Sequence, residues 1–177
     1  MIIWFLFGMM CTLVVLLALT YFKFSALRIA TQEAWNKLDN NMKNRAELIP
    51  TLALFAASFE ELDRNFVYEF SKMREVCRKP SSLKERIACE GEVTKYFKKI
   101  FTAAMDHPEL KQDEAFLKLQ KNIILAEGKV QKAKKKYNTA ARDYNTLTSV
   151  IPLNLLAAAL EFTPFEYFDF DNSLDQK

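Results

Sequence analysis

Four polar residues have the side chains that a binding or catalytic site would need: Arg45, Glu127, Tyr137 and Asn138. An arginine can hold an anion, a carboxylate can move a proton, and a phenol beside an amide can orient a small molecule. The last two belong to the stretch KKKYNTAARDYNTL, in which the Tyr-Asn pair recurs as Tyr144 and Asn145. Two interpretations compete: a polar site that binds a ligand, and a packing device in a long helix.

The seven-residue interval favours packing. Tyr137 and Tyr144 occupy equivalent heptad positions with small alanines between them, so they can interdigitate with a facing layer. A buried tyrosine needs a partner for its hydroxyl. Asn138 and Asn145 lie on the flank of this face, where an amide can bridge to a neighbouring helix and fix its register. We therefore predict that the two Tyr-Asn pairs form a helix seam.

Arg45 falls on the predicted inner face of a helix near the N-terminus, and Glu127 flanks the seam. A buried or half-buried contact between them would fix how the two helices pair, because removing either residue would leave the other charge unpaired. We predict a structural polar pair. Two unrelated surface charges, or a ligand site, remain as alternatives.

The sequence shows no complete set of catalytic or metal-binding residues. The single histidine, His107, precedes Pro108 in a predicted turn, and no serine or cysteine has a histidine on a shared predicted face. Motifs such as Glu-x-x-His, His-Glu-x-x-His and Cys-x-x-Cys are absent. We expect no catalytic residue, no cofactor, no metal and no enzymatic activity. A sensor or an enzyme that uses Arg45, Glu127, Tyr137 and Asn138 is the alternative.

A basic patch is predicted at Lys129, Lys132, Lys134, Lys135 and Lys136. A solvated helix face is the simplest interpretation, and contact with anionic lipid headgroups or an acidic partner is the sharper one. The net charge of +3 is small and no aromatic stacking platform is interleaved, so nucleic acid is not expected as a partner.

The elements that must position these residues begin with an apolar run. Residues 2–22 carry no charge, and as a helix they would span about 30 Å, the thickness of a bilayer's hydrocarbon core. A cleaved signal peptide is disfavoured because a basic n-region is missing. Cations follow the run at Lys23, Arg28 and Lys37, which predicts a single-pass membrane protein with its N-terminus outside and the rest in the cytoplasm.

The remainder is predicted to be all-α. Only 3 glycines and 5 prolines are present, which disfavours sandwiches and Gly-rich phosphate loops. Apolar residues at 3-4 spacing predict a long helix from about residue 113 to Pro152, and another covers about 82–106 with Ser81 or Ser82 as its N-cap.

The segment from about 24 to 77 is also helical and contains Pro50. A break near Leu48–Pro50 gives an antiparallel up-and-down four-helix bundle after the membrane helix. Three long helices, the first kinked at Pro50, are the alternative. The expected domains are the anchor at 1–23, the bundle at 24–161 and an aromatic, acidic tail at 162–177, which is expected to dock on the bundle.

Of the three cysteines, Cys11 lies in the apolar run, and Cys77 and Cys89 flank a predicted turn. A disulfide between the latter two is possible, but reduced core cysteines are the simpler expectation.

Several stretches together resemble the LemA family: NRAELIPTL at 44–52, HPELKQDEAFLKLQ at 107–120, AEGKVQKAKKKYNTAARDYN at 126–145, IPLNLLAAALEF at 151–162 and YFDF at 167–170. The resemblance implies a membrane-anchored helical bundle with a short outer N-terminus and an inner C-terminal domain. The family has no agreed biochemical activity, and some relatives are associated with magnetosome membranes, which implies a scaffolding role.

We therefore expect a non-catalytic scaffold or adaptor for membrane or envelope proteins. It would contact the lipid bilayer through residues 2–22 and an unidentified membrane or envelope protein, and a homo-oligomer is possible.

Overall fold

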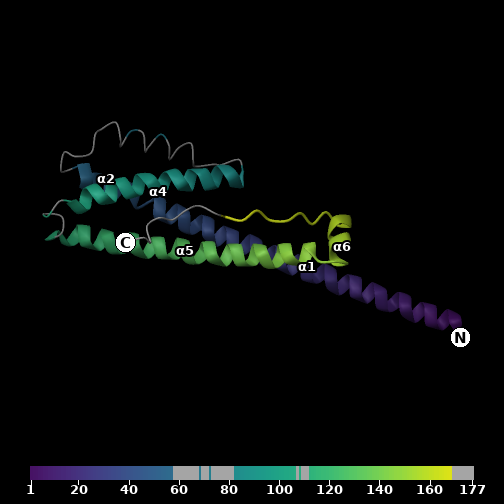
Figure 1. The fold of residues 1–177 in the computed structure, drawn as a ribbon. Coiled ribbons are helices and arrows are strands. Elements are labelled where there is room, and N and C mark those ends of the chain that lie inside the picture. Colours follow the sequence, from purple (N-terminus) through teal and green to yellow (C-terminus); the bar gives the residue numbers. More distant parts are fainter. Residues whose placement is uncertain (58–67, 69–71, 73–81, 107, 109–111, 169–177) are drawn as a thin grey trace. The chain divides into compact units, whose positions relative to one another are not determined.

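The computed structural model describes the chain except at residues 58–67, 69–71, 73–81, 107, 109–111 and 169–177. The described residues form helices and no strands, which confirms the all-α prediction for this part of the chain (Figure 1). The helices are α1 (Ile2–Ala46), α2 (Ile49–Ala57), α4 (Leu83–Asp106), α5 (Glu114–Ser149) and α6 (Leu153–Ala159). The predicted turn residue His107 lies outside the described residues.

Helix α1 is continuous from the apolar run into the charged sequence that follows it. It has 45 residues, about 68 Å at the α-helical rise. Its N-terminal part is long and apolar enough to cross a membrane, and no residue of the most apolar stretch is buried in the protein. The predicted N-terminal apolar helix is thus confirmed, and it has no break at the expected anchor boundary after residue 23.

The first two helices are separated near Pro50. Helix α1 ends at Ala46, a turn covers Glu47 and Leu48, and α2 begins at Ile49. The Leu48 N–H donates to the Arg45 carbonyl at 3.1 Å, which closes the last turn of α1. Pro50 stands in the first turn of α2, where its missing N–H has no helical partner to lose. An interruption of the helix at Glu47 and Leu48, next to the predicted position, is confirmed. The choice between two separate helices and one helix kinked at Pro50 stays a prediction.

Helix α2 packs against α4. The second helix was expected to continue to about residue 77, and most of that continuation lies outside the described residues. The arrangement as a four-helix bundle therefore stays a prediction.

Two side chains cap the later helices. Ser82 Oγ accepts a hydrogen bond from the Glu85 N–H at 3.2 Å, as predicted for the start of α4, whereas the alternative cap Ser81 lies outside the described residues. At the start of α5, Asp113 Oδ1 accepts from the Phe116 N–H at 2.7 Å. Each cap satisfies a backbone donor that the helix itself leaves without a partner.

Helix α5 buries the stripe that the 3-4 spacing predicts. The buried apolar and aromatic residues of this helix are Phe116, Leu119, Ile123, Val130, Ala133, Tyr137, Ala141 and Tyr144. A 3-4 continuation from Ala133 and Tyr137 leads to Ala140, but the stripe shifts by one residue there, and Ala141 is buried while Ala140 is half-buried. The helix was predicted to reach Pro152, but α5 ends at Ser149, and Ile151 beyond its end is 79% exposed.

One expectation about the cysteines is wrong. Cys89 is disulfide-bonded rather than reduced. Cys77, the other cysteine considered for this bond, lies outside the described residues. Cys11 is free and exposed on α1.

The chain forms two compact units. Unit 1 comprises Met1–Asn36 and Lys135–Tyr167, and unit 2 comprises Lys37–Lys134 and Phe168–Lys177. Helices α1 and α5 contribute residues to both units. The expected domain boundaries after residues 23 and 161 both fall inside unit 1.

Candidate functional site

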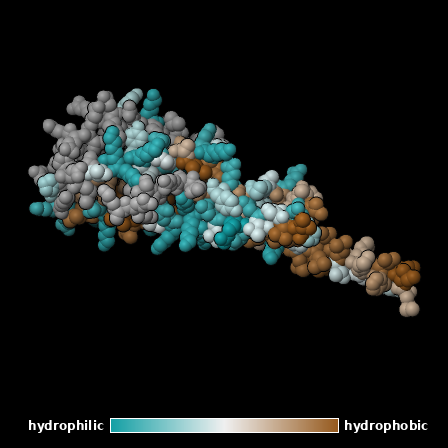
Figure 2. All heavy atoms as spheres, in the orientation of Figure 1, coloured by the Kyte–Doolittle hydropathy of each residue, from teal (hydrophilic) through white to brown (hydrophobic). Residues whose placement is uncertain are grey.

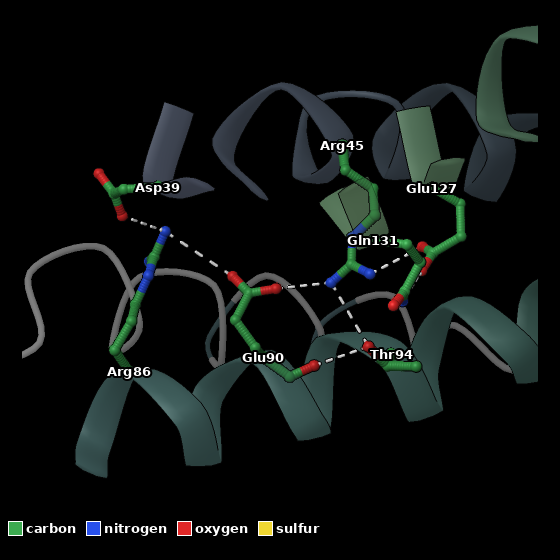
Figure 3. A network of polar contacts seen from close by, with 7 residues as sticks. All are labelled: Asp39, Arg45, Arg86, Glu90, Thr94, Glu127 and Gln131. Carbon is green, nitrogen blue, oxygen red and sulfur yellow. Dashed lines mark hydrogen bonds and ion pairs between the residues drawn. The ribbon is translucent and has the colours of Figure 1, made fainter. Parts of the chain in front are cut away.

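The strongest cluster of charges lies in unit 2 and is built on Arg45 in the last turn of α1 (Figure 3). The side chain of Arg45 is only 2% exposed. Its Nη1 donates to Glu127 Oε2 on α5 at 2.8 Å, and its Nη2 donates to Glu90 Oε2 on α4 at 2.5 Å. One guanidinium thus connects three helices through charge-assisted hydrogen bonds.

A second arginine extends the cluster along α4. Arg86 Nη2 lies 2.7 Å from Asp39 Oδ1 on α1 and 3.7 Å from Glu90 Oε1, so Glu90 stands between the two arginines (Figure 3). Two arginines face three carboxylates here: Asp39, Glu90 and Glu127. The positive charges are therefore matched inside the cluster by acidic groups of the same chain.

Neutral side chains complete the cluster. The Thr94 hydroxyl donates to the Glu90 backbone carbonyl at 2.8 Å and lies 3.4 Å from Arg45 Nη2. Gln131 Nε2 donates to the other oxygen of Glu127, Oε1, at 3.0 Å. Both oxygens of Glu127 therefore accept hydrogen bonds from the chain itself (Figure 3).

Burial sets the protonation behaviour of Glu90. Removal from water raises the pKa of this carboxyl above its ordinary value, because the charged form loses hydration. The adjacent Arg45 and Arg86 guanidinium groups lower the pKa again, but their effect is smaller than that of burial. Burial therefore favours the protonated form of Glu90.

The predicted pair Arg45 and Glu127 is in contact, but sequence reasoning missed the other members of the cluster. Arg86, Glu90 and Thr94 are spaced four residues apart on one face of α4, next to the buried Val93 and Phe97. Polar residues at helical spacing on an otherwise apolar face are the signal that could have identified them.

The Tyr-Asn pairs lie in unit 1, where α5 contacts the extended segment 162–167. The Tyr137 hydroxyl donates to the Glu166 backbone carbonyl at 2.8 Å, and the Trp35 ring packs edge-on against Tyr137 with centroids 5.4 Å apart. Burial, with a smaller contribution from the Glu166 carboxylate, raises the pKa of Tyr137. This hydroxyl therefore stays protonated and acts as a hydrogen-bond donor.

Asn145 binds the same segment through both the NH2 group and the oxygen of its side-chain amide. Its Nδ2 donates to the Phe165 carbonyl at 2.8 Å, and its Oδ1 accepts from the Phe165 N–H at 2.8 Å. The side chain thus pairs with one residue of extended backbone as a neighbouring strand would. The prediction that Asn145 bridges to a neighbouring helix is wrong, because its partner is the C-terminal segment.

Aromatic rings fix the rest of the C-terminal segment. Phe165 packs edge-on against Tyr144, with ring centroids 5.0 Å apart. Phe162 stacks on Phe24 of α1 at 5.2 Å, and the Arg28 guanidinium lies 5.9 Å from the Phe162 ring. The aromatic tail therefore docks on unit 1 as far as Tyr167, as expected. Asn138, the remaining seam residue, is half-buried.

The basic patch is solvent-exposed at Lys129, Lys132, Lys135 and Lys136, and half-buried at Lys134. All five lysines belong to α5. Lys129, Lys132 and Lys134 lie in unit 2, and Lys135 and Lys136 lie in unit 1.

Of the four residues that could have formed one polar site, Arg45 and Glu127 belong to unit 2, and Tyr137 and Asn138 belong to unit 1. Within the part of the chain that the structure describes, no group of three His, Cys, Asp or Glu side chains could hold a metal ion. The three carboxylates of the ion cluster, Asp39, Glu90 and Glu127, face arginines instead.

Comparison with protein-family profiles gives a match over most of the chain. The profile of the LemA family matches residues 34–177, a range that includes the complete ion cluster and the Tyr-Asn pairs but not the apolar part of α1. No curated protein matches the chain. Because the family match covers most of the sequence, the chain belongs to the LemA family.

Proposed function

We propose that this LemA-family protein is held at a membrane by α1 and acts by contact, as a scaffold or adaptor for other membrane or envelope proteins, without catalysing a reaction. The observation that carries the proposal is the ion cluster of unit 2. Its arginine and its central carboxylate, Arg45 and Glu90, are only 1% and 3% exposed and bind each other. A buried guanidinium and carboxylate that bind each other hold helices together.

Catalysis needs the opposite arrangement. A general base or nucleophile must reach a substrate with a free lone pair. In unit 1 the Tyr137 hydroxyl and both groups of the Asn145 amide are bound to backbone atoms of the C-terminal segment. Tyr137, one of the residues considered for an active site, therefore supports a structural role, as does Asn145 of the second Tyr-Asn pair.

The exposed lysines of α5 are the proposed contact surface. Lys129, Lys132, Lys135 and Lys136 carry positive charge into solvent, which suits an acidic partner protein at the membrane. Anchoring confines both partners to the same surface and raises their effective concentration, so a weak contact suffices. A second copy of this chain is a further possible neighbour in such an assembly.

Two features bear on the side of the membrane. Lys23, Arg28 and Lys37 follow the apolar run and favour the cytoplasm, whereas the disulfide bond of Cys89 favours an oxidising compartment. We propose the cytoplasmic side, because the charges adjoin the span and act directly on its insertion. We further propose that the segment after α2 completes an antiparallel four-helix bundle.

The proposal is tested by proximity labelling in cells, with a labelling enzyme fused to the full-length protein. The variant Lys129→Glu/Lys132→Glu/Lys135→Glu/Lys136→Glu reverses the charge of the proposed contact surface. Lys118→Glu/Lys121→Glu is the control, since it reverses two exposed lysines of the same helix outside this surface. Membrane amounts of each protein are equalised before labelled neighbours are compared by mass spectrometry.

We expect a specific set of membrane-protein neighbours for the wild type and the control variant, and loss of this set for the four-lysine variant. Labelling that is the same for all three proteins would contradict the proposed contact surface. A reaction catalysed by the purified full-length protein and abolished by Arg45→Met would contradict the non-catalytic role.

A further inference from the structure

A second apolar surface is exposed in unit 1, outside the apolar run of α1. No charged residue occurs between Asp143 and Glu161, and this stretch includes the end of α5 and all of α6. Several of its large apolar side chains face solvent: Val150 at 49%, Ile151 at 79%, Leu155 at 70% and Leu160 at 41% exposed. Hydrophobic residues clustered in this way mark a contact surface rather than an ordinary exterior.

Contacts within unit 1 place this surface beside the end of the apolar run. Phe162, shortly after α6, stacks on Phe24 and also lies 6.2 Å from the Tyr21 ring. On α1, Thr20 is half-buried and Phe24 is fully buried, whereas the residues before Thr20 are exposed. The protein therefore begins to cover α1 within the last turn of the apolar run, before the first cation at Lys23.

The hydrophobic surface is continuous across these elements. Figure 2 shows hydrophobic atoms over α6 next to the hydrophobic stretch of α1. If the bilayer surrounds residues 2–22, its boundary lies at the level of Tyr21 and Lys23, where Phe162 joins α6 to α1. An aqueous position would leave the apolar residues of α6 in water at this level.

We propose that α6, with the flanking residues Val150, Ile151 and Leu160, lies in the lipid interface as a second membrane contact beside the α1 span. This inference rests on the proposed membrane anchoring. An uncharged apolar segment at the end of a span suits the boundary between headgroups and acyl chains, where short helices are buried by roughly 5–10 Å. The occupant of the surface is lipid, because the surface continues that of the span.

The second contact gives α6 a role in orientation. A single helical span leaves the attached protein free to rotate about the helix axis. A lipid contact at α6, displaced from that axis, restricts the tilt of unit 1 and its distance from the membrane. It would thereby hold unit 1 at a defined tilt and height above the bilayer.

The inference is tested by tryptophan quenching in the full-length protein, reconstituted in phosphatidylcholine vesicles with lipids brominated near the top of the acyl chains. Trp4 lies in the apolar run and Trp35 in the later part of α1, so Trp4→Phe provides a parent protein with one native tryptophan. Leu155→Trp is added to this parent as the probe. Thr139→Trp, at an exposed neutral position on α5, is the matched control.

We expect brominated lipid to quench the added tryptophan of Leu155→Trp several-fold more strongly than that of Thr139→Trp, with a blue-shifted emission. Ile151→Trp serves as a second probe from the same surface. Circular dichroism establishes that each variant retains the helical content of the parent.

Quenching of Trp4 in the wild type distinguishes a failure of the α6 contact from a failure of the membrane anchoring by α1. Quenching of Trp4 with no excess quenching of either Leu155→Trp or Ile151→Trp would overturn the α6 contact and leave anchoring intact. Absence of quenching at Trp4 itself would overturn the anchoring, and the inference with it.

Discussion

At the scale of single residues, Arg45 has the largest structural role in unit 2. It comes from the last turn of α1 and binds carboxylates on both α4 and α5. Burying a guanidinium is unfavourable unless its partners are well placed, so the net gain over an apolar core can be small. The cluster nevertheless specifies which helix faces meet, because a shift of one turn would separate the buried charges.

Replacing Arg45 by methionine should therefore be strongly destabilising. The change leaves Glu90 and Glu127 buried without their main partner, and removing one member of a buried ion pair costs about 3–5 kcal/mol. The free energy of unfolding is measured by urea titration of the full-length protein in detergent micelles, followed by circular dichroism. Lys43→Ala is the control, since Lys43 pairs with Asp39 at an exposed position and its loss should cost under about 1 kcal/mol. Equal losses for the two variants would contradict the role of Arg45.

Glu90 should make stability depend on pH with a defined sign. Its folded pKa is raised, so its contribution to the free energy of unfolding is fully present below the ordinary pKa of 4.5 and is lost as pH rises through the folded pKa. We expect the stability of the wild type relative to Glu90→Gln to fall as pH increases over this window. Urea titrations of both proteins across the pH range measure it, and Glu92→Gln controls for loss of an exposed carboxylate on α4. A relative stability that rises with pH would have the wrong sign.

How much of the ion cluster the sequence reveals depends on each residue's neighbours. Arg45 and Glu127 could be paired because one falls on an inner face and the other flanks a clear apolar stripe. Glu90 and Arg86 were missed because α4 carries many charges, and most of them are exposed. In the sequence, a charged residue that tertiary contacts bury looks the same as one in solvent. Only the pattern of all residues on the same helix face can distinguish them.

At the scale of elements, the C-terminal segment is an extended strap along α1 and α5 of unit 1. Its backbone is bound by Tyr137 and Asn145, and its rings pack on Phe24 and Tyr144. Irregular backbone next to a helix needs side-chain partners for its N–H and C=O groups. Tyr137 of the first Tyr-Asn pair and Asn145 of the second provide them at two adjacent residues of the strap, Glu166 and Phe165.

Replacing Asn145 by alanine should release this strap locally. The change removes both hydrogen bonds to Phe165, and each is worth about 0.5–1.5 kcal/mol. Hydrogen–deuterium exchange of residues 162–167, followed by mass spectrometry, should accelerate about tenfold, while exchange in α4 stays unchanged. Asn122→Ala is the control at an exposed position of α5. Unchanged exchange in the strap would show that its aromatic contacts alone hold it.

The elements themselves could be predicted to different degrees. Pro50 and the need for helices of similar length indicated the break after α1, and the 3-4 spacing indicated α5. Helix α6 was missed because it is short and apolar on several sides, so it has no clear amphipathic pattern. The partner of Asn145 could not be inferred either, since an extended segment far along the chain leaves no periodic signal.

At the scale of the whole molecule, the central question is which side of the membrane holds the residues after α1. The cations after the apolar run and the disulfide of Cys89 point to different compartments. Disulfide bonds are rare in the reducing cytosol and common in oxidising compartments, whereas the positive-inside rule acts during insertion. A measurement of sidedness therefore tests both the orientation and the redox state of Cys89.

Lys84→Cys provides this measurement. Lys84 is exposed near the start of α4, and its replacement leaves the Ser82 cap in place. With the proposed orientation, a membrane-impermeant thiol reagent should label the variant only after the cells are permeabilised, because the membrane separates the reagent from α4. The wild type is the matched control, and its signal from the native cysteines is subtracted. Labelling of Lys84→Cys in intact cells would contradict the proposed orientation and would place the Cys89 disulfide in an oxidising compartment, where such bonds are common.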